Sequence, residues 1–329
     1  MPQIVYRALG KSGASVSAVG LGCMSLSGVY GAAEDAQSEA LIQHAVDTGI
    51  NHLDTSDMYG WGHNEQVVGR AIAGNRRDKV VLASKFGQLR SENGTNEVNG
   101  RPEYVRAACD ASLKRLGVEV IDLYYQHRVD PDVPVEDTVG EMSRLVERGK
   151  VRFLGLSEAK PERIRRAHAT YPIAAVQTEY SLLYRTEAEE TRETTRELGI
   201  AFVAYSPLGR GFLTGSLKTL ADIDGRRAQH PRFQAEHFDH NRALAARIEA
   251  LAARKGCTPS QLTLAWLLAQ GDDVVAIPGT RYARRLDENA AAMAVALTPA
   301  ELEEITETVP KGAASGERYP AAGMKAVYL

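Results

Sequence analysis

The chain has 329 residues, of which 44% are hydrophobic and 25% charged, and its formal net charge is −3. This composition is ordinary for a globular protein, and the small net charge argues against binding to nucleic acid or to an anionic membrane surface. The N-terminus lacks the apolar core of a signal peptide, and no apolar run is long enough to span a bilayer. Three scattered cysteines match no disulfide or zinc-binding spacing, so we expect a reduced, cytoplasmic protein.

Short apolar runs alternate with amphipathic stretches along the chain. Eight continuous apolar strands separated by helices predict a parallel sheet that is covered on both faces. Eight such units in this length favour a closed (β/α)8 barrel, the TIM-barrel architecture, over an open doubly wound sheet. The predicted strands are residues 19–24, 50–56, 80–85, 121–127, 151–157, 174–180, 201–206 and 274–280, and helices are predicted, for example, at 36–47, 102–116 and 135–148.

Segments outside the eight units complete the predicted fold. Residues 1–18 resemble a β-hairpin that turns at residues 10–13 and plugs the bottom of the barrel. Thr258 and Thr298 each begin a Thr-Pro-x-Gln/Glu pattern that is typical of a capped helix N-terminus, so we expect an extra helix after the last strand. No linker divides the chain, and we predict one domain over residues 1–329.

The longest polar stretch is residues 215–241. A connection of this length in a compact domain is often functional. Its histidines, His230, His237 and His240, have no firm metal-binding spacing, and no metal site is predicted. We expect them to lie on a mobile surface segment.

Four reactive side chains lie at or just after the ends of neighbouring predicted strands. Asp54, Lys85 and His127 end strands two, three and four, and Tyr59 follows strand two. The active site of a barrel of this kind lies at the C-terminal ends of its strands, so we expect the four side chains to converge there. Any one of them alone would more often be a cap, a solvated charge or a structural residue. Their combination favours a catalytic site.

The chemistry expected of this quartet is proton donation to a carbonyl oxygen. An unperturbed tyrosine has a pKa of about 10, and a nearby ammonium such as that of Lys85 is expected to lower it. Asp54 would hold the ammonium in place, and a neutral His127 would orient the carbonyl group by a hydrogen bond. None of these groups supplies electrons, so a reduction needs a bound hydride donor.

The sequences DTSDMYG, ASKFG and YYQH, in this order and spacing, resemble the aldo-keto reductase superfamily, and the resemblance covers nearly the whole chain. It implies reduction of aldehydes or ketones to alcohols, with Tyr59 as general acid, Lys85 and Asp54 tuning it, and His127 orienting the substrate. It also implies a nicotinamide dinucleotide, usually NADPH, bound across the mouth of the barrel.

Further residues match the family's cofactor contacts. Ser157 and Gln177 correspond to groups that bind the carboxamide, but Glu158 stands where the family usually has asparagine. Tyr205 matches the aromatic residue that stacks under the nicotinamide. The polar sequence after it would meet the pyrophosphate. The complete predicted set is Gly22, Met24, Ser157, Gln177, Tyr205, Ser206, Leu208, Gly209, Arg210, Gly211, Gly279, Thr280, Arg281, Arg285, Glu288 and Asn289.

A basic segment near residue 280 predicts the position of the 2′-phosphate. We expect Thr280 to cap a helix whose first turns carry Arg281, Arg284 and Arg285. Cations at the N-terminal end of a helix interact unfavourably with the helix dipole, unless an anion lies among them. A basic turn exposed to solvent is the simpler alternative. Gly279 stands where the family usually has lysine, and Arg281 follows two positions later, so we expect a preference for NADPH over NADH.

Two questions stay open at this stage. The same fold serves in regulatory subunits that resemble potassium-channel beta subunits, which is the alternative to a working reductase. Within the superfamily, GERYPAAGMKAV and PRFQAEHFDHN resemble the branch of perakine-reductase-like and auxin-induced-like reductases. Met24, Tyr30, Trp61 and Arg128 are candidates for the pocket of a small carbonyl substrate. The substrate itself and the oligomeric state are not predicted.

Overall fold

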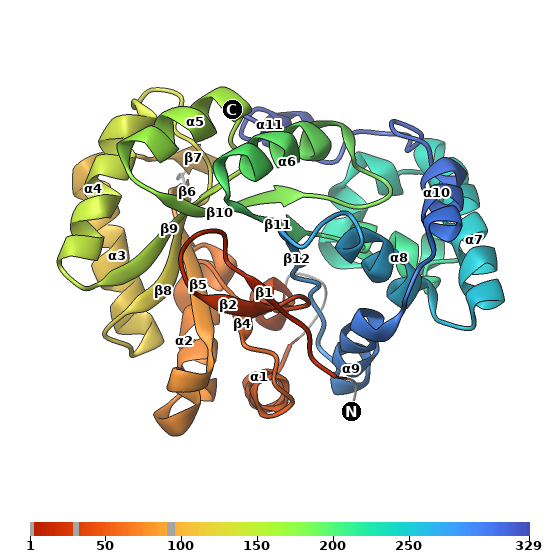
Figure 1. Cartoon of the computed structure of the whole chain (residues 1–329), viewed down its shortest axis with the longest axis horizontal. Helices are drawn as coiled ribbons and strands as arrows, with labels where there is room; N and C mark the ends of the chain where they lie inside the picture. Colours follow the sequence, from red (N-terminus) through yellow and green to blue (C-terminus); the bar gives the residue numbers. More distant parts are fainter. Residues whose placement is uncertain (1–2, 29–32, 91–95) are drawn as a thin grey trace.

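A computed structural model describes residues 3–28, 33–90 and 96–329. Its central sheet has eight parallel strands in the order β3-β4-β5-β8-β9-β10-β11-β12 (Figure 1). Parallel bridges from Val19 to Ala276 and from Gly22 to Gly279 join the two ends of the sheet. The strands are β3 (Leu21–Gly22), β4 (His52–Asp54), β5 (Val81–Phe86), β8 (Ile121–Gln126), β9 (Val151–Ser157), β10 (Ile173–Glu179), β11 (Ala201–Tyr205) and β12 (Val274–Ala276). Each overlaps one predicted run, and the predicted (β/α)8 barrel is confirmed.

Helices surround the sheet on its outer side (Figure 1). Helix α4 illustrates why they lie there: Val135, Val139, Met142 and Leu145 recur at helical spacing and form a buried stripe toward the sheet. The helices are α1 (Asp35–Asp47), α2 (His63–Ala71), α3 (Pro102–Leu116), α4 (Val135–Glu147), α5 (Pro161–Thr170), α6 (Thr186–Leu198), α7 (Ala235–Lys255), α8 (Pro259–Leu268), α9 (Ala283–Ala291), α10 (Pro299–Thr308) and α11 (Ala321–Met324). In the described part of the chain, no helix is both long and apolar enough to cross a membrane.

The N-terminal hairpin closes one end of the barrel, as predicted. Strands β1 (Tyr6–Ala8) and β2 (Ser15–Ser17) pair antiparallel. Leu9 and Val16 are fully buried and belong to the cluster of side chains that fills the barrel interior. A second small ribbon, β6 (Gln88–Arg90) with β7 (Asn96–Val98), follows β5.

Both predicted helix starts are present. Thr258 and Thr298 each accept a hydrogen bond from the backbone N–H three residues later and complete a capping box, which opens α8 and the extra helix α10.

The polar stretch 215–241 differs from the expectation of a mobile connection. It contains three short 3-10 turns, and helix α7 already begins at Ala235. His230 is buried, and its Nδ1 lies 2.8 Å from the carbonyl oxygen of Arg318. His237 and His240 likewise contact Ser315 and Ala313. The three histidines therefore bind the C-terminal segment, a role that their spacing in the sequence does not reveal.

Candidate active site

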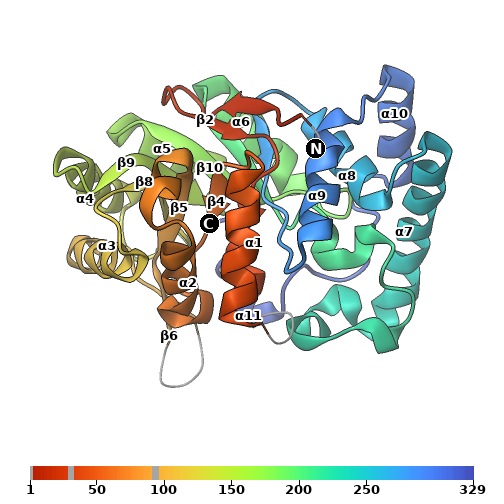
Figure 2. The same ribbon diagram turned by 90° about the horizontal axis from the view of Figure 1, so that it is seen from below.

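A cavity of about 1130 Å³ opens at the C-terminal ends of the strands. Helix α11, which lines this cavity, and the hairpin of β1 and β2 lie at opposite ends of the barrel (Figure 2). Of the predicted catalytic residues, Asp54, Tyr59 and His127 line the cavity, and Lys85 is buried beside them. The predicted cofactor residues that line it are Gly22, Met24, Ser157, Gln177, Tyr205, Ser206, Leu208, Arg210, Gly211, Gly279, Thr280, Arg285, Glu288 and Asn289.

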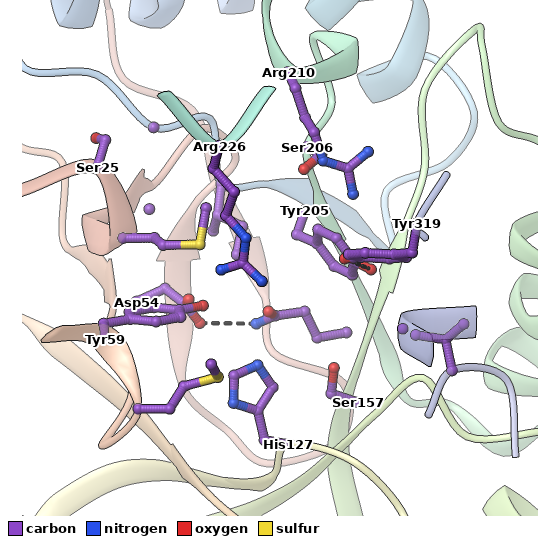
Figure 3. Close-up of a pocket in the computed structure, with 18 of the residues that line it drawn as sticks. Ser25, Asp54, Tyr59, His127, Ser157, Tyr205, Ser206, Arg210, Arg226 and Tyr319 are labelled. Atoms are coloured by element: carbon purple, nitrogen blue, oxygen red, sulfur yellow. Dashed lines mark hydrogen bonds between the residues drawn. The ribbon is translucent and has the colours of Figure 1, made fainter. Parts of the chain in front are cut away.

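Lys85 connects the predicted proton donor to a buried acid. Its ammonium donates hydrogen bonds to Asp54 Oδ1, to the carbonyl oxygen of Thr55 at 2.8 Å and to the Tyr59 hydroxyl at 3.3 Å. Asp54 also accepts a hydrogen bond of 2.8 Å from Gln177 Nε2, marked by the dashed line in Figure 3. A fully buried ammonium needs a carboxylate partner, and Asp54 supplies it. The predicted convergence of Asp54, Tyr59 and Lys85 is therefore present in the structure.

The pKa of Tyr59 moves in the opposite direction to that expected from Lys85. Burial raises it above the usual value of 10, and the nearby Lys85 ammonium only partly opposes this shift. The hydroxyl therefore keeps its proton at neutral pH. This is the protonation state that a proton donor needs, and the ammonium 3.3 Å away is positioned to stabilise the phenolate once it forms.

His127 lies across the cavity floor from Tyr59 with its ring nearly perpendicular to the phenol, and the two ring centres are 5.9 Å apart (Figure 3). Burial holds its pKa well below the usual 6.5, and the cationic side chains of Arg128, Lys85 and Arg226 add to the shift. The ring is therefore neutral, as predicted. Its Nδ1 lies 3.1 Å from the Ser56 hydroxyl, which fixes the orientation of the ring.

The end of the cavity near the catalytic groups contains Ser157, Gln177 and Tyr205 from adjacent strands β9, β10 and β11. Glu158 is not part of it. Its carboxylate binds Arg318 through two hydrogen bonds and does not line the cavity. In this arrangement Glu158 is therefore not placed to contact the carboxamide of a bound cofactor in the way that the family asparagine does.

The loop after β11 contributes Ser206, Leu208 and Gly211 to the cavity, whereas Gly209 is not among the lining residues. Arg210 lines the cavity, but its guanidinium also donates hydrogen bonds of 3.1 and 2.8 Å to Glu179. The arginine that we expected to meet a pyrophosphate thus already has a buried carboxylate partner.

The basic segment before α9 departs from the prediction in one respect. Helix α9 begins at Ala283, its N-cap is Tyr282, and Thr280 is not the cap. The Thr280 hydroxyl instead accepts a hydrogen bond from the Tyr282 backbone N–H in a local turn, because the chain needs two more residues before it enters the helix. Arg281 consequently precedes the helix and does not line the cavity, whereas Arg284 and Arg285 do.

Several lining residues were not predicted. Arg226 points into the middle of the cavity, and Tyr319 lies beside Tyr205 (Figure 3). Much of the segment 319–329 also lines it. Arg226 belongs to the long polar stretch 215–241, whose length indicates a functional connection. Residues 319–329 follow no strand end, and their only signal is the branch-like tail sequence.

The four candidates for the substrate pocket lie in different places. Met24 and Arg128 line the cavity. Trp61 lies instead at a separate depression of about 350 Å³ with Tyr104 and Arg115. Tyr30 lies outside the described residues.

Fold and site together define a class of protein. A closed parallel barrel carries a buried Lys–Asp pair under a tyrosine hydroxyl, beside a neutral histidine and a long cavity. This combination is that of a barrel oxidoreductase that protonates a carbonyl oxygen.

Comparison with known proteins identifies the family. The model of the aldo/keto reductase family matches residues 18–310, and the chain belongs to this family. It is 49% identical over 314 residues to probable aldo-keto reductase 1 of Glycine max, covering 94% of this chain and 90% of the relative. Members of the family catalyse NAD(P)H-dependent carbonyl reduction, and the comparisons favour this activity over a regulatory subunit.

Solved structures agree with this membership. The glycerol dehydrogenase AKR11B4 from Gluconobacter oxydans superimposes with a TM-score of 0.83 at 29% identity, covering 92% of this chain and 94% of that one. The holo form of aldo-keto reductase AKR11C1 from Bacillus halodurans gives 0.77 at 27% identity, with 97% and 99% coverage.

Proposed function

We propose that the protein reduces small aldehydes or ketones to alcohols in the cytoplasm, with NADPH as hydride donor and Tyr59 as the proton donor. The observation that carries this proposal is the buried Lys85 ammonium, which donates a hydrogen bond to the Tyr59 hydroxyl at the floor of the cavity. This ammonium is positioned to stabilise the phenolate that remains after the Tyr59 hydroxyl has transferred its proton.

The cavity has groups suited to a dinucleotide. Ser157 and Gln177 offer hydrogen bonds to a carboxamide, and the Tyr205 ring offers a surface for stacking. At the other end, Arg284 and Arg285 have no carboxylate partner among the described residues, and a phosphate dianion would complement them. When bound, the cofactor supplies a hydride to the carbonyl carbon. The preference for NADPH over NADH is attributed to Arg285.

The protein's own residues act on the carbonyl oxygen. His127, neutral and oriented by Ser56, is placed to hold the substrate oxygen near Tyr59 by a hydrogen bond. Tyr59 then donates its proton as the oxygen becomes negative. Lys85, held by Asp54, stabilises the remaining phenolate, and the hydrogen bond from Gln177 to Asp54 holds that carboxylate in position.

Replacement of Tyr59 by phenylalanine tests the proposal. We expect kcat for a small aldehyde to fall by a factor of about 10² to 10⁴, the usual contribution of a general acid, because only the transferable proton is lost. NADPH binding, followed by quenching of intrinsic fluorescence, should remain within about twofold of the wild type. Tyr6→Phe is the matched control, because its hydroxyl binds the carbonyl oxygen of Gly49 on the hairpin side of the barrel. Near-normal turnover of Tyr59→Phe would rule out Tyr59 as the proton donor.

A further inference from the structure

Glu158 occupies an unusual position directly after Ser157 of β9. Its backbone has a left-handed φ of 56°, which is unfavourable for a residue with a Cβ atom and persists only where surrounding contacts hold it. Its carboxylate provides those contacts. Oε1 accepts hydrogen bonds from Arg318 at 2.7 Å, from the Tyr205 hydroxyl at 2.8 Å and from the Glu179 backbone N–H at 3.1 Å. The acceptor capacity of this oxygen is filled from within the protein.

Arg318 is the partner that brings the C-terminal segment to this carboxylate. Its side chain is completely buried, and its second nitrogen, Nη2, donates to Glu158 Oε2 at 2.6 Å. The guanidinium also lies 4.3 Å from the centre of the Tyr184 ring. A planar guanidinium with two parallel hydrogen bonds fixes direction as well as distance, so the pair determines where the chain continues after residue 318.

The chain after Arg318 forms one wall of the cavity. Tyr319, Ala322, Lys325 and Val327 are among its lining residues. The Tyr319 hydroxyl lies 2.9 Å from that of Tyr205, and the two side chains lie side by side in Figure 3. Tyr205 therefore contacts both the carboxylate that anchors the segment and the first residue of the wall.

We propose that the Glu158–Arg318 ion pair positions residues 319–329 as a wall of the substrate site and couples this wall, through Tyr205, to the cofactor site. The inference rests on the proposed function, in which Tyr205 stacks against the nicotinamide. Glu158 is thus a positioning residue, and the departure from the family asparagine follows from the need to anchor the segment.

The double variant Glu158→Gln/Arg318→Met tests the proposal, because it removes both charges while largely preserving side-chain volume and leaves no unpaired buried charge. In the wild type, NADPH should slow amide hydrogen exchange across residues 318–329. In the double variant we expect exchange in this segment to be at least tenfold faster, and NADPH should no longer slow it. The KM for a bulky aromatic aldehyde should rise at least tenfold, while kcat changes less than threefold.

His240→Ala is the matched control. It removes a contact of 2.7 Å to the carbonyl oxygen of Ala313, which lies just before the wall and outside the cavity lining. It should leave both KM and the NADPH effect on exchange unchanged. A folded double variant with wild-type KM and wild-type protection by NADPH overturns the proposal, as does a wild type whose segment is insensitive to NADPH. The exchange measurement needs cofactor binding but no turnover, so absence of reductase activity would contradict the proposed function separately.

Discussion

His52 on β4 is fully buried, and neither of its ring nitrogens has a hydrogen-bond partner among the described residues. Burial lowers its pKa from 6.5 to about 4, while the Asp54 carboxylate opposes this shift and the Lys85 ammonium adds to it. The folded protein therefore keeps His52 neutral at pH 5, whereas the unfolded chain binds a proton there. Such a difference in proton binding makes the free energy of unfolding decrease as the pH falls below 6.5.

Replacement of His52 by leucine should remove this part of the acid sensitivity. From the two pKa values, His52 is expected to account for about 2 kcal/mol of the stability lost between pH 8 and pH 5. Urea unfolding of the wild type and the variant at both pH values measures this contribution. The comparison is between the unfolding free energy that each protein loses from pH 8 to pH 5, so a constant effect of the new packing cancels. An equal loss in the variant and the wild type would show that His52 titrates normally in the folded protein.

The hairpin of β1 and β2 shows how one element can depend on a single glycine. Gly10 and Gly13 flank its turn, and both have positive φ, at 57° and 83°. A Cβ atom on Gly10 would lie 2.7 Å from the carbonyl oxygen of Ala174 at the base of β10, whereas a Cβ atom on Gly13 would meet nothing within 4 Å. At the tip of the hairpin, Gly10 is thus in close contact with the barrel, whereas Gly13 faces open space.

Alanine at each position separates backbone strain from steric contact. Gly13→Ala should cost about 1 kcal/mol, the usual strain of a left-handed alanine. Gly10→Ala adds a collision with backbone that cannot rotate away, and we expect it to cost at least about 1 to 3 kcal/mol more, as overpacking typically does. Thermal unfolding of the pair gives the comparison. Equal losses of stability would mean that the hairpin moves freely away from the base of the barrel.

The sequence predicts the ends of the regular helices well, but it predicts the contacts of the cavity segments after β11 poorly. The ends of helices α1, α3 and α4 agree with the predicted ranges to within one residue, since apolar periodicity and, for α3, a proline at N1 define them locally. The prediction of Thr280 as the helix cap was wrong, because a local turn places two more residues before the helix. Arg210 lines the cavity as predicted, but its buried partner Glu179 lies 31 residues earlier in the chain and could not be read from the motif. The pKa of Tyr59 was misjudged for a similar reason, since the extent of burial is not visible in a motif.

The cavity runs from Asp54, beside Lys85, to the first turn of α9. Cofactor binding should therefore be measurable as an increase in the free energy of unfolding of the whole molecule. A ligand that binds only the folded state at 100 times its Kd adds about 2.7 kcal/mol to the free energy of unfolding. NADPH is therefore expected to raise the melting temperature by more than NADH does at equal concentration.

Arg285→Ala should reduce this NADPH effect specifically. Loss of a charged contact to the 2′-phosphate is worth about 1.5 to 3 kcal/mol, a tenfold or larger rise in Kd, and the NADH effect should stay the same. Arg281→Ala is the comparison variant, since that side chain does not line the cavity. If Arg285→Ala leaves the difference between NADPH and NADH unchanged, the preference has another origin.

The histidine contacts from His230, His237 and His240 to the C-terminal segment have a consequence for how this protein could acquire new substrates. The groups proposed to move the proton all precede residue 128, while the proposed substrate wall and the groups that anchor it, Glu158 and the three histidines, all follow that residue. The part of a relative's chain from β9 onward, transplanted as one piece with these anchors, should therefore bring a new selectivity to an unchanged catalytic centre.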